Sequence, residues 1–139
     1  MKIYFAGAIR GGRDDGAIYL EFITLLQKYG TVLTEHIGSK TLSALGELEV
    51  TPEYIYNRDI DWIKECDVVV AEVTQPSLGV GYEIAKAEEW GKRILCLYRP
   101  SEGKRLSAMI QGSKNLQVHN YQKIGDVELL LENFFILYN

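Results

Sequence analysis

Apolar and polar positions follow two patterns along this chain. Short runs that are apolar almost throughout are typical of strands buried on both faces, and apolar residues recurring every three or four positions are typical of helices with one buried side. The short runs predict five strands, at 2–7, 31–37, 67–73, 93–99 and 116–121. The helical pattern predicts four helices, at 16–29, 52–66, 79–90 and 125–138.

Residue types at the ends of these segments agree with the pattern. Thr51 can cap the second helix and Pro52 can occupy its first position. Gly30 and Gly91 follow two other helices, where glycine commonly ends the helical backbone. Residues 38–50 show no periodicity, so we expect a loop there.

Almost continuously apolar strands that alternate with helices predict an α/β fold. We expect a single doubly wound, Rossmann- or flavodoxin-like domain over residues 1–139, with a five-stranded parallel sheet flanked by helices. In such sheets ligands bind beyond the carboxyl ends of the strands. The loops 7–16, 74–82 and 100–115 follow those ends and are rich in Gly, Ser and Arg. We therefore expect the functional site at this edge.

Composition narrows the class of protein. The chain has 139 residues, 47% of them hydrophobic, and a net charge of −4, which argues against nucleic acid as a partner. No apolar run is long enough for a membrane span or a signal peptide. Cys66 and Cys96 lie in apolar segments, as expected of reduced core thiols. These features predict a cytoplasmic protein, or a nuclear one in a eukaryotic source, without a membrane or nucleic-acid partner.

Asp59 interrupts an apolar helix face. At about 100° per residue it falls in one arc with Ile55, Trp62, Ile63 and Cys66. A carboxylate among apolar groups is costly unless it is paired or hydrogen-bonded. Two explanations stay open, a structural Asp bonded to a loop or an arginine, and a site residue; the place at the ligand edge favours the second.

Glu83 closes the stretch "TQPSLGVGYE" (74–83), which leads from a strand into a helix. The pattern places Glu83 in the first helical turn, where a negative charge is worth ~0.3–1 kcal/mol against the macrodipole. The alternative is that Glu83 faces a ligand. Two carboxylates at one edge could cleave a glycosidic bond, one of them attacking the anomeric carbon at a mutual spacing of ~5–5.5 Å.

The loop "GAIRGGRDDG" (7–16) suits an anion. Gly11 and Gly12 allow close approach of the backbone, and Arg10 or Arg13 can bind phosphate or carboxylate. The loop lacks the spacing of a P-loop or of a dinucleotide fingerprint, so a plain surface turn stays open as the alternative.

Other chemically capable side chains are interpreted as structural. His36 and His119 form no metal-binding or Ser-His-acid spacing, so we expect no metal and no cofactor. Trp62, Trp90 and Tyr19 lie on predicted helices at positions where packing is the simpler explanation.

Several segments together resemble the 2'-deoxynucleoside 5'-phosphate N-hydrolases, within the nucleoside 2-deoxyribosyltransferase superfamily. They are "YFAGAIRGGRDD", "YGTVLTEHI", "DIDW", "DVVVAEVTQPSLGVGYE", "GKRILCLYRP" and "LSAMIQG". The resemblance covers Lys2 to Gly112 and continues more faintly to the end. It implies hydrolysis of the N-glycosidic bond of 2'-deoxynucleoside 5'-monophosphates to free base and 2-deoxyribose 5-phosphate, in a homodimer without cofactor.

The resemblance also implies roles for particular residues. Glu83 matches the nucleophile that forms a covalent glycosyl-enzyme, Asp59 the second carboxylate, and Tyr4, at the end of the first strand, a tyrosine that orients the nucleophile and crowds the 2' face of the sugar. The matching substrate-binding positions are Gly7, Ala8, Ile9, Arg10, Gly11, Ser77, Gly79, Ser107, Ala108 and Met109, and of these Ser107 and Met109 are donated to the neighbouring site of a homodimer.

Two positions bear on the substrate. Ser107 stands where base-exchanging deoxyribosyltransferases generally carry Asn, and a hydroxyl suits a phosphate. Ala8 replaces a serine of the hydrolases, which could weaken phosphate binding by ~1.5–3 kcal/mol. Base exchange on nucleosides and a non-catalytic nucleotide-binding module therefore stay open as alternatives.

Overall fold

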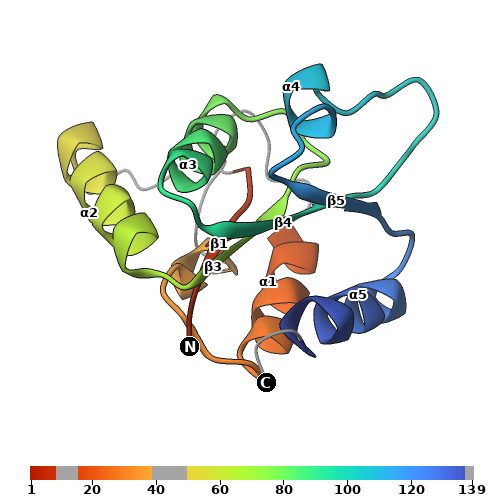
Figure 1. The fold of residues 1–139 in the computed structure, drawn as a ribbon, viewed down its shortest axis with the longest axis horizontal. Coiled ribbons are helices and arrows are strands. Elements are labelled where there is room, and N and C mark those ends of the chain that lie inside the picture. Colours follow the sequence, from red (N-terminus) through yellow and green to blue (C-terminus); the bar gives the residue numbers. More distant parts are fainter. Residues whose placement is uncertain (9–15, 39–49, 137–139) are drawn as a thin grey trace.

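The computed structural model describes residues 1–8, 16–38 and 50–136 and confirms the predicted α/β fold (Figure 1). All five strands are parallel, in the order β2-β1-β3-β4-β5. The elements in chain order are β1 (Lys2–Ala6), α1 (Gly16–Leu26), β2 (Thr31–Val32), η1 (Glu35–Gly38), α2 (Pro52–Glu65), β3 (Val68–Glu72), α3 (Leu78–Glu89), β4 (Arg93–Tyr98), α4 (Ala108–Gln111), β5 (Gln117–Asn120) and α5 (Ile124–Ile136).

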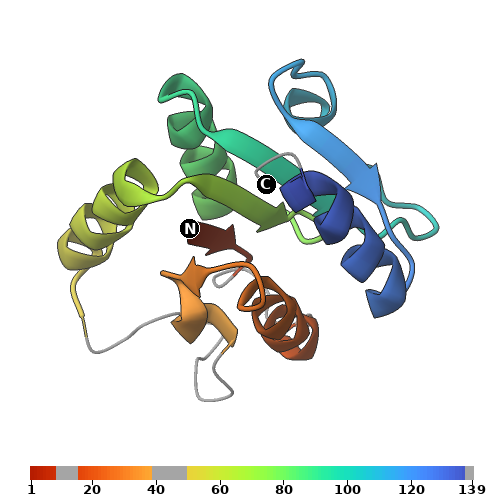
Figure 2. The same ribbon diagram turned by 60° about the horizontal axis from the view of Figure 1, so that its bottom comes forward.

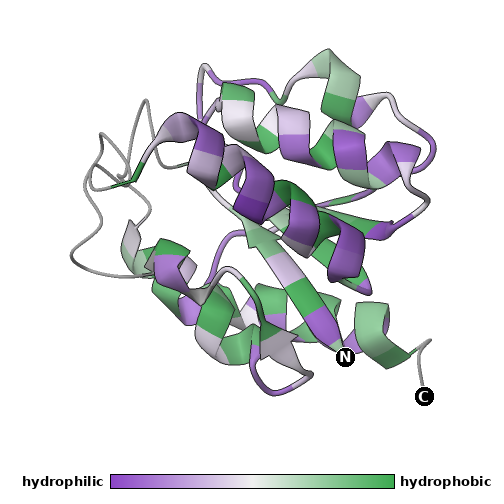
Figure 3. Ribbon diagram, turned by 90° about the vertical axis from the view of Figure 1, so that its left-hand side faces the viewer, coloured by the Kyte–Doolittle hydropathy of each residue, from purple (hydrophilic) through white to green (hydrophobic). Residues whose placement is uncertain are grey.

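Helices cover both faces of the sheet. α1 and α5 lie on one face, and α2, α3 and α4 lie on the other (Figures 1 and 2). Alternate residues of β3 enter the two resulting cores, Val68 and Val70 on the α1 side and Val69 and Ala71 on the α2 side. The outward side of α2 is largely hydrophilic, whereas the strands behind it are mostly hydrophobic (Figure 3). This double burial is the reason that the inner strands β1, β3 and β4 are almost continuously apolar, whereas the edge strand β5 is polar and mostly exposed.

The predicted strand at 31–37 is wrong beyond its first two residues, because Thr34 replaces strand pairing with side-chain hydrogen bonds. Its Oγ1 accepts the N–H of Phe5 at 2.9 Å and donates to the Phe5 carbonyl at 2.7 Å. The N–H of Ile37 then donates to the Thr34 carbonyl at 3.0 Å, within the 3-10 helix η1. The chain therefore turns away from the sheet edge after β2.

Helix bounds also differ from the expected ones. α1 ends at Leu26 instead of 29, and isolated turns carry the chain on to Tyr29. The short helix α4 lies within 100–115, where only a loop was expected. Ser107 caps it, and four residues are too few to produce a helical periodicity in the sequence.

A buried carboxyl group joins the carboxyl ends of three strands. Glu72, at the end of β3, is fully buried and accepts hydrogen bonds from the N–H of Thr74 at 2.6 Å and the Thr74 hydroxyl at 2.9 Å. The Tyr121 hydroxyl, just after β5, also donates to Glu72. Thr74 Oγ1 in turn accepts the N–H of Arg99, just after β4, at 2.9 Å. Glu72 thereby fixes the starting points of the loops at the ligand edge.

We expect Tyr121→Phe to lower the free energy of unfolding by about 1–3 kcal/mol, because it removes a hydrogen bond from a buried carboxyl group. Urea denaturation monitored by circular dichroism measures the loss. Tyr29→Phe is the matched control, since the Tyr29 ring stacks on Phe135 in the same core while the residue is partly exposed. Equal stability of the Tyr121→Phe variant and wild type would contradict the structural role of this bond.

Candidate active site

Tyr4 and Glu83 meet although 79 positions separate them in the sequence. The Tyr4 hydroxyl donates to Glu83 Oε2 at 2.5 Å. Tyr4 is fully buried on the face of β1 that α2 and α3 cover, and Glu83 lies on α3. Tyr4 was expected at the end of the first strand but lies in the middle of β1, because the strand continues to Ala6.

The simplest explanation of Glu83, as a first-turn charge, is wrong. α3 begins at Leu78, with Ser77 as its cap, and its first turn contains no acidic residue. Glu83 lies in the second turn, where the macrodipole has largely lost its effect. Its carboxyl group is instead directed to the Tyr4 hydroxyl.

Asp59 is paired with its neighbour in the chain. Arg58 Nε donates to Asp59 Oδ1 at 3.0 Å, and the two side chains are only 16% and 21% exposed. The arginine partner foreseen for a structural Asp is thus present. Asp59 also acts electrostatically on Tyr4 and Glu83, so these three side chains share one environment.

Burial and neighbouring charges shift the pKa values of Glu83 and Tyr4. Burial, with a contribution from Asp59, raises the pKa of Glu83 to about 8, and the Tyr4 hydrogen bond and the Arg58 charge oppose that rise. Burial, Glu83 and Asp59 together raise the pKa of Tyr4 well above its ordinary value. Tyr4 is therefore a hydrogen-bond donor at neutral pH, while Glu83 titrates close to neutrality. A group with such a pKa suits nucleophilic or acid–base catalysis.

Ser77 and Gly79 lie next to this pair. Ser77 Oγ accepts the N–H of Val80 at 3.2 Å and so caps α3. A Cβ added to Gly79 would lie 3.8 Å from Ser77 Oγ and 3.9 Å from Glu83 Oε1. Glycine at this position leaves the space between the cap and the carboxyl group open.

Gly7 and Ala8 pack against Tyr19. A Cβ on Gly7 would come within 3.1 Å of the Tyr19 ring, and the N–H of Ala8 donates to the Tyr19 hydroxyl at 3.1 Å. Tyr19 is fully buried and packs edge-on against Phe5, as expected of a packing residue. Ile9, Arg10 and Gly11, which complete the predicted anion loop, lie outside the described residues.

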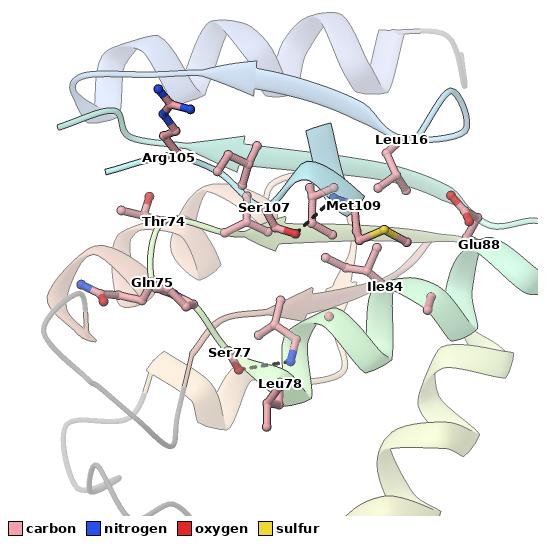
Figure 4. Close-up of a pocket in the computed structure, with 17 residues that line it drawn as sticks. Thr74, Gln75, Ser77, Leu78, Ile84, Glu88, Arg105, Ser107, Met109 and Leu116 are labelled. Atoms are coloured by element: carbon pink, nitrogen blue, oxygen red, sulfur yellow. Dashed lines mark hydrogen bonds between the residues drawn. The ribbon is translucent and has the colours of Figure 1, made fainter. Parts of the chain in front are cut away.

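Ser107 and Met109 line a groove, and Ala108 between them does not. The groove, of about 720 Å³, lies between α3 and α4, and Met109 points across it toward Ile84 (Figure 4). Ser107 Oγ accepts the N–H of Met109 at 3.2 Å, and Met109 is 83% exposed. Tyr4, Asp59 and Glu83 do not line this groove, whereas Ser77, which lies close to Glu83, does.

Arg58 is the residue of this region that the sequence analysis missed. Its Cζ lies 4.8 Å from the Trp62 ring centroid and 5.8 Å from that of Tyr54. Its Nη2 lies 3.4 Å from His36 Nε2. The available signal was spacing, since Tyr54 and Trp62 stand four positions before and after Arg58 on one helix.

Some of the side chains interpreted as structural have the packing that was expected. Trp62 and Trp90 pack against the α2-side core, and Cys66 and Cys96 are buried and free. Over residues 1–8, 16–38 and 50–136, no helix is long and apolar enough to pass through a membrane.

The fold and the sequence together define the family. The family model for nucleoside 2-deoxyribosyltransferases matches residues 3–124, and the chain belongs to this family.

Particular relatives are more similar still. A protein of Tetraodon nigroviridis named 5-hydroxymethyl-dUMP N-hydrolase is 52% identical over 140 residues, which cover 97% of each chain. The Homo sapiens protein of the same name is 49% identical over 137 residues, covering 96% of this chain and 78% of the relative. The solved structure of a CMP N-glycosidase from Clostridium botulinum superposes with a TM-score of 0.66 at 23% identity, over 95% of this chain and 99% of that one. This last likeness bears on the fold alone.

Proposed function

We propose that this protein hydrolyses the N-glycosidic bond of 2'-deoxynucleoside 5'-monophosphates, releasing free base and 2-deoxyribose 5-phosphate. The observation that carries the proposal is the partly buried Tyr4–Glu83 hydrogen bond of 2.5 Å, with Asp59 close enough to raise the pKa of Glu83. The names of relatives about half identical to this chain, 5-hydroxymethyl-dUMP N-hydrolase, support the reaction and the class of substrate.

The proposed mechanism has two displacements. The ionised Glu83 attacks C1' of the deoxyribose as the C1'–N bond to the base breaks, which gives an ester between sugar and enzyme. Asp59 donates a proton to the departing base, and it takes a proton back from the water in the second displacement. Water then attacks C1', and its oxygen stays on the sugar while Glu83 leaves as a carboxylate. The Tyr4 hydroxyl holds one oxygen of Glu83 and leaves little room for a 2'-hydroxyl.

The 5'-phosphate belongs at the amino end of α3 in this proposal. Ser77 and Gly79 lie beside Glu83 at that end, and helix amino termini favour anions. The remaining contacts come from the loop after β1, at Gly7, Ala8, Ile9, Arg10 and Gly11. Ala8 offers no hydroxyl and its N–H already donates to the Tyr19 hydroxyl, so neighbouring residues must supply the contact that the resemblance assigns to a serine.

A second copy of the chain completes the proposed site. Ser107, Ala108 and Met109 are exposed, and the groove that Ser107 and Met109 line does not include Glu83, which supports the donation of Ser107 and Met109 to a partner. Mixing Glu83→Gln with Ser107→Ala subunits tests this arrangement. Partial recovery of activity, with a dimer in sedimentation, is expected; two inactive variants that stay inactive together would count against it.

Release of free base from a panel of nucleotides tests the reaction. Wild type and Glu83→Ala are incubated with deoxynucleoside monophosphates, their ribonucleotide counterparts and the dephosphorylated nucleosides, and the products are separated by chromatography. We expect release from deoxynucleotides by wild type only. Release solely from deoxynucleosides that lack phosphate would overturn the substrate assignment.

The alternatives give different products in the same experiment. Addition of a second free base leaves hydrolysis unchanged, whereas a base-exchanging transferase forms a new nucleoside. A nucleotide-binding module would bind the deoxynucleotide and release no base. Residence in the cytoplasm is part of the proposal and is supported by the two buried, free cysteines; cell fractionation tests it.

A further inference from the structure

We propose that Arg58 is a positioning residue of this site, which holds Asp59 in place and supplies the positive charge that lets two carboxyl groups share one pocket. The inference rests on the proposed function for its kinetic consequences. Its structural basis is independent of the substrate.

Arg58 is held by contacts from two elements. On α2 its Nε bonds Asp59 Oδ1 at 3.0 Å, and its guanidinium lies over Trp62 with Cζ at 4.8 Å from the ring centroid. From η1, His36 places Nε2 at 3.4 Å from Nη2. A guanidinium with an aromatic ring, a carboxylate and an imidazole around it has little freedom to turn.

The pairing of Arg58 with Asp59 is unusual for a helix. Successive residues project about 100° apart, so neighbours do not ordinarily face each other. The Arg58 side chain must bend around the helix to reach Asp59. Its contacts with Trp62 and His36 supply the reason that it does so.

The positive charge of Arg58 acts on both carboxyl groups, those of Asp59 and Glu83. Like charges in one site make ionisation of either group harder, and a nearby cation reverses this effect. Among the described residues, the charged and titratable groups that contact Arg58 are Tyr54 and Asp59 from α2 and His36 from η1, and its charge also acts on Tyr4 from β1 and Glu83 from α3. Because its side chain is only 16% exposed, water screens this charge weakly.

Arg58→Met tests the inference, with Arg58→Lys as a second variant. We expect Arg58→Met to lower kcat at pH 7 by ~10–100-fold with little change in KM, since an unanchored Asp59 and a less ionised Glu83 slow the chemical step. The acid limb of kcat/KM moves to higher pH, because the lost positive charge no longer lowers the pKa of Glu83. Arg58→Lys keeps the charge, so it restores the position of that limb but only part of kcat.

Lys64→Met is the matched control. Lys64 lies on the same helix and its Nζ is 5.3 Å from the Trp90 ring centroid, so the variant also removes a cation from an aromatic face. We expect its rate and pH profile to equal those of wild type. If Arg58→Met keeps the wild-type pH profile and kcat, or loses only thermal stability, the inference is overturned.

A measurement without substrate separates this inference from the proposed function. A carbon-13 NMR titration of the Glu83 carboxyl group should show a higher pKa in Arg58→Met than in wild type. If wild type releases no base from any deoxynucleotide, the proposed function fails while this titration still decides the electrostatic role of Arg58. Equal titration curves in the two proteins would overturn that role.

Discussion

Glu83→Gln should reduce base release by at least ~10³-fold, because an amide cannot form the sugar ester on which the reaction depends. The substitution keeps the size of the side chain, and its amide oxygen can still accept the Tyr4 hydroxyl. The protein should therefore fold normally and still bind the nucleotide. Single-turnover base release, measured beside equilibrium binding, separates a lost chemical step from lost affinity.

Glu89→Gln is the matched control for this variant. Glu89 is the last residue of α3, its side chain is 65% exposed, and it pairs with Lys86 at 3.7 Å. We expect this control to keep the wild-type rate. A Glu83→Gln protein that retained a tenth of wild-type activity would rule out covalent catalysis by Glu83.

Asp59→Asn should lower kcat by ~10²–10³-fold and yet shift the acid limb of the kcat/KM profile to lower pH. The rate falls because Asn cannot donate a proton to the departing base. The limb shifts because the Asp59 charge raises the pKa of Glu83, so a neutral residue allows Glu83 to ionise more easily. Rate profiles between pH 5 and pH 10 measure both effects.

Tyr4→Phe should shift the acid limb of the kcat/KM profile in the opposite direction from Asp59→Asn. The Tyr4 hydrogen bond lowers the pKa of Glu83, so its loss should move the limb to higher pH. The wild-type limb should lie between the two, near the Glu83 pKa of about 8. Limbs that move in the same direction in both variants would contradict the electrostatic arrangement of Tyr4, Asp59 and Glu83.

The sequence pattern was sufficient for most of the fold. Parallel strands buried on both faces leave continuous apolar runs, and four of the five runs became strands close to the expected bounds. The exception, 31–37, is instructive. Its apolar character was real, but a single hydroxyl, that of Thr34, took over the hydrogen bonds of Phe5 and ended the pairing. Side-chain competition of this kind has no periodic signature.

The site was predictable to a different extent for each residue. Asp59 stood out because it broke an apolar helix face, whereas Glu83 was placed one turn too early in its helix. The pairing of Tyr4 with Glu83 depends on how α3 crosses the sheet, which the resemblance implied and the residue pattern did not. Arg58 was not singled out in the sequence, although it stands next to Asp59. Its contact with His36 arises only when η1 and α2 come together.

The network around Glu72 has a consequence for protein engineering. One carboxyl group anchors the exits of β3 and β5 directly and that of β4 through Thr74, so the loops that leave those strands are not independent modules. A loop grafted from a relative to change base or phosphate preference would still depend on the hydrogen bonds of Glu72 and Thr74 at its start. Libraries that hold Glu72, Thr74 and Tyr121 constant while varying the residues beyond them should give more folded variants than libraries that randomise all of these positions.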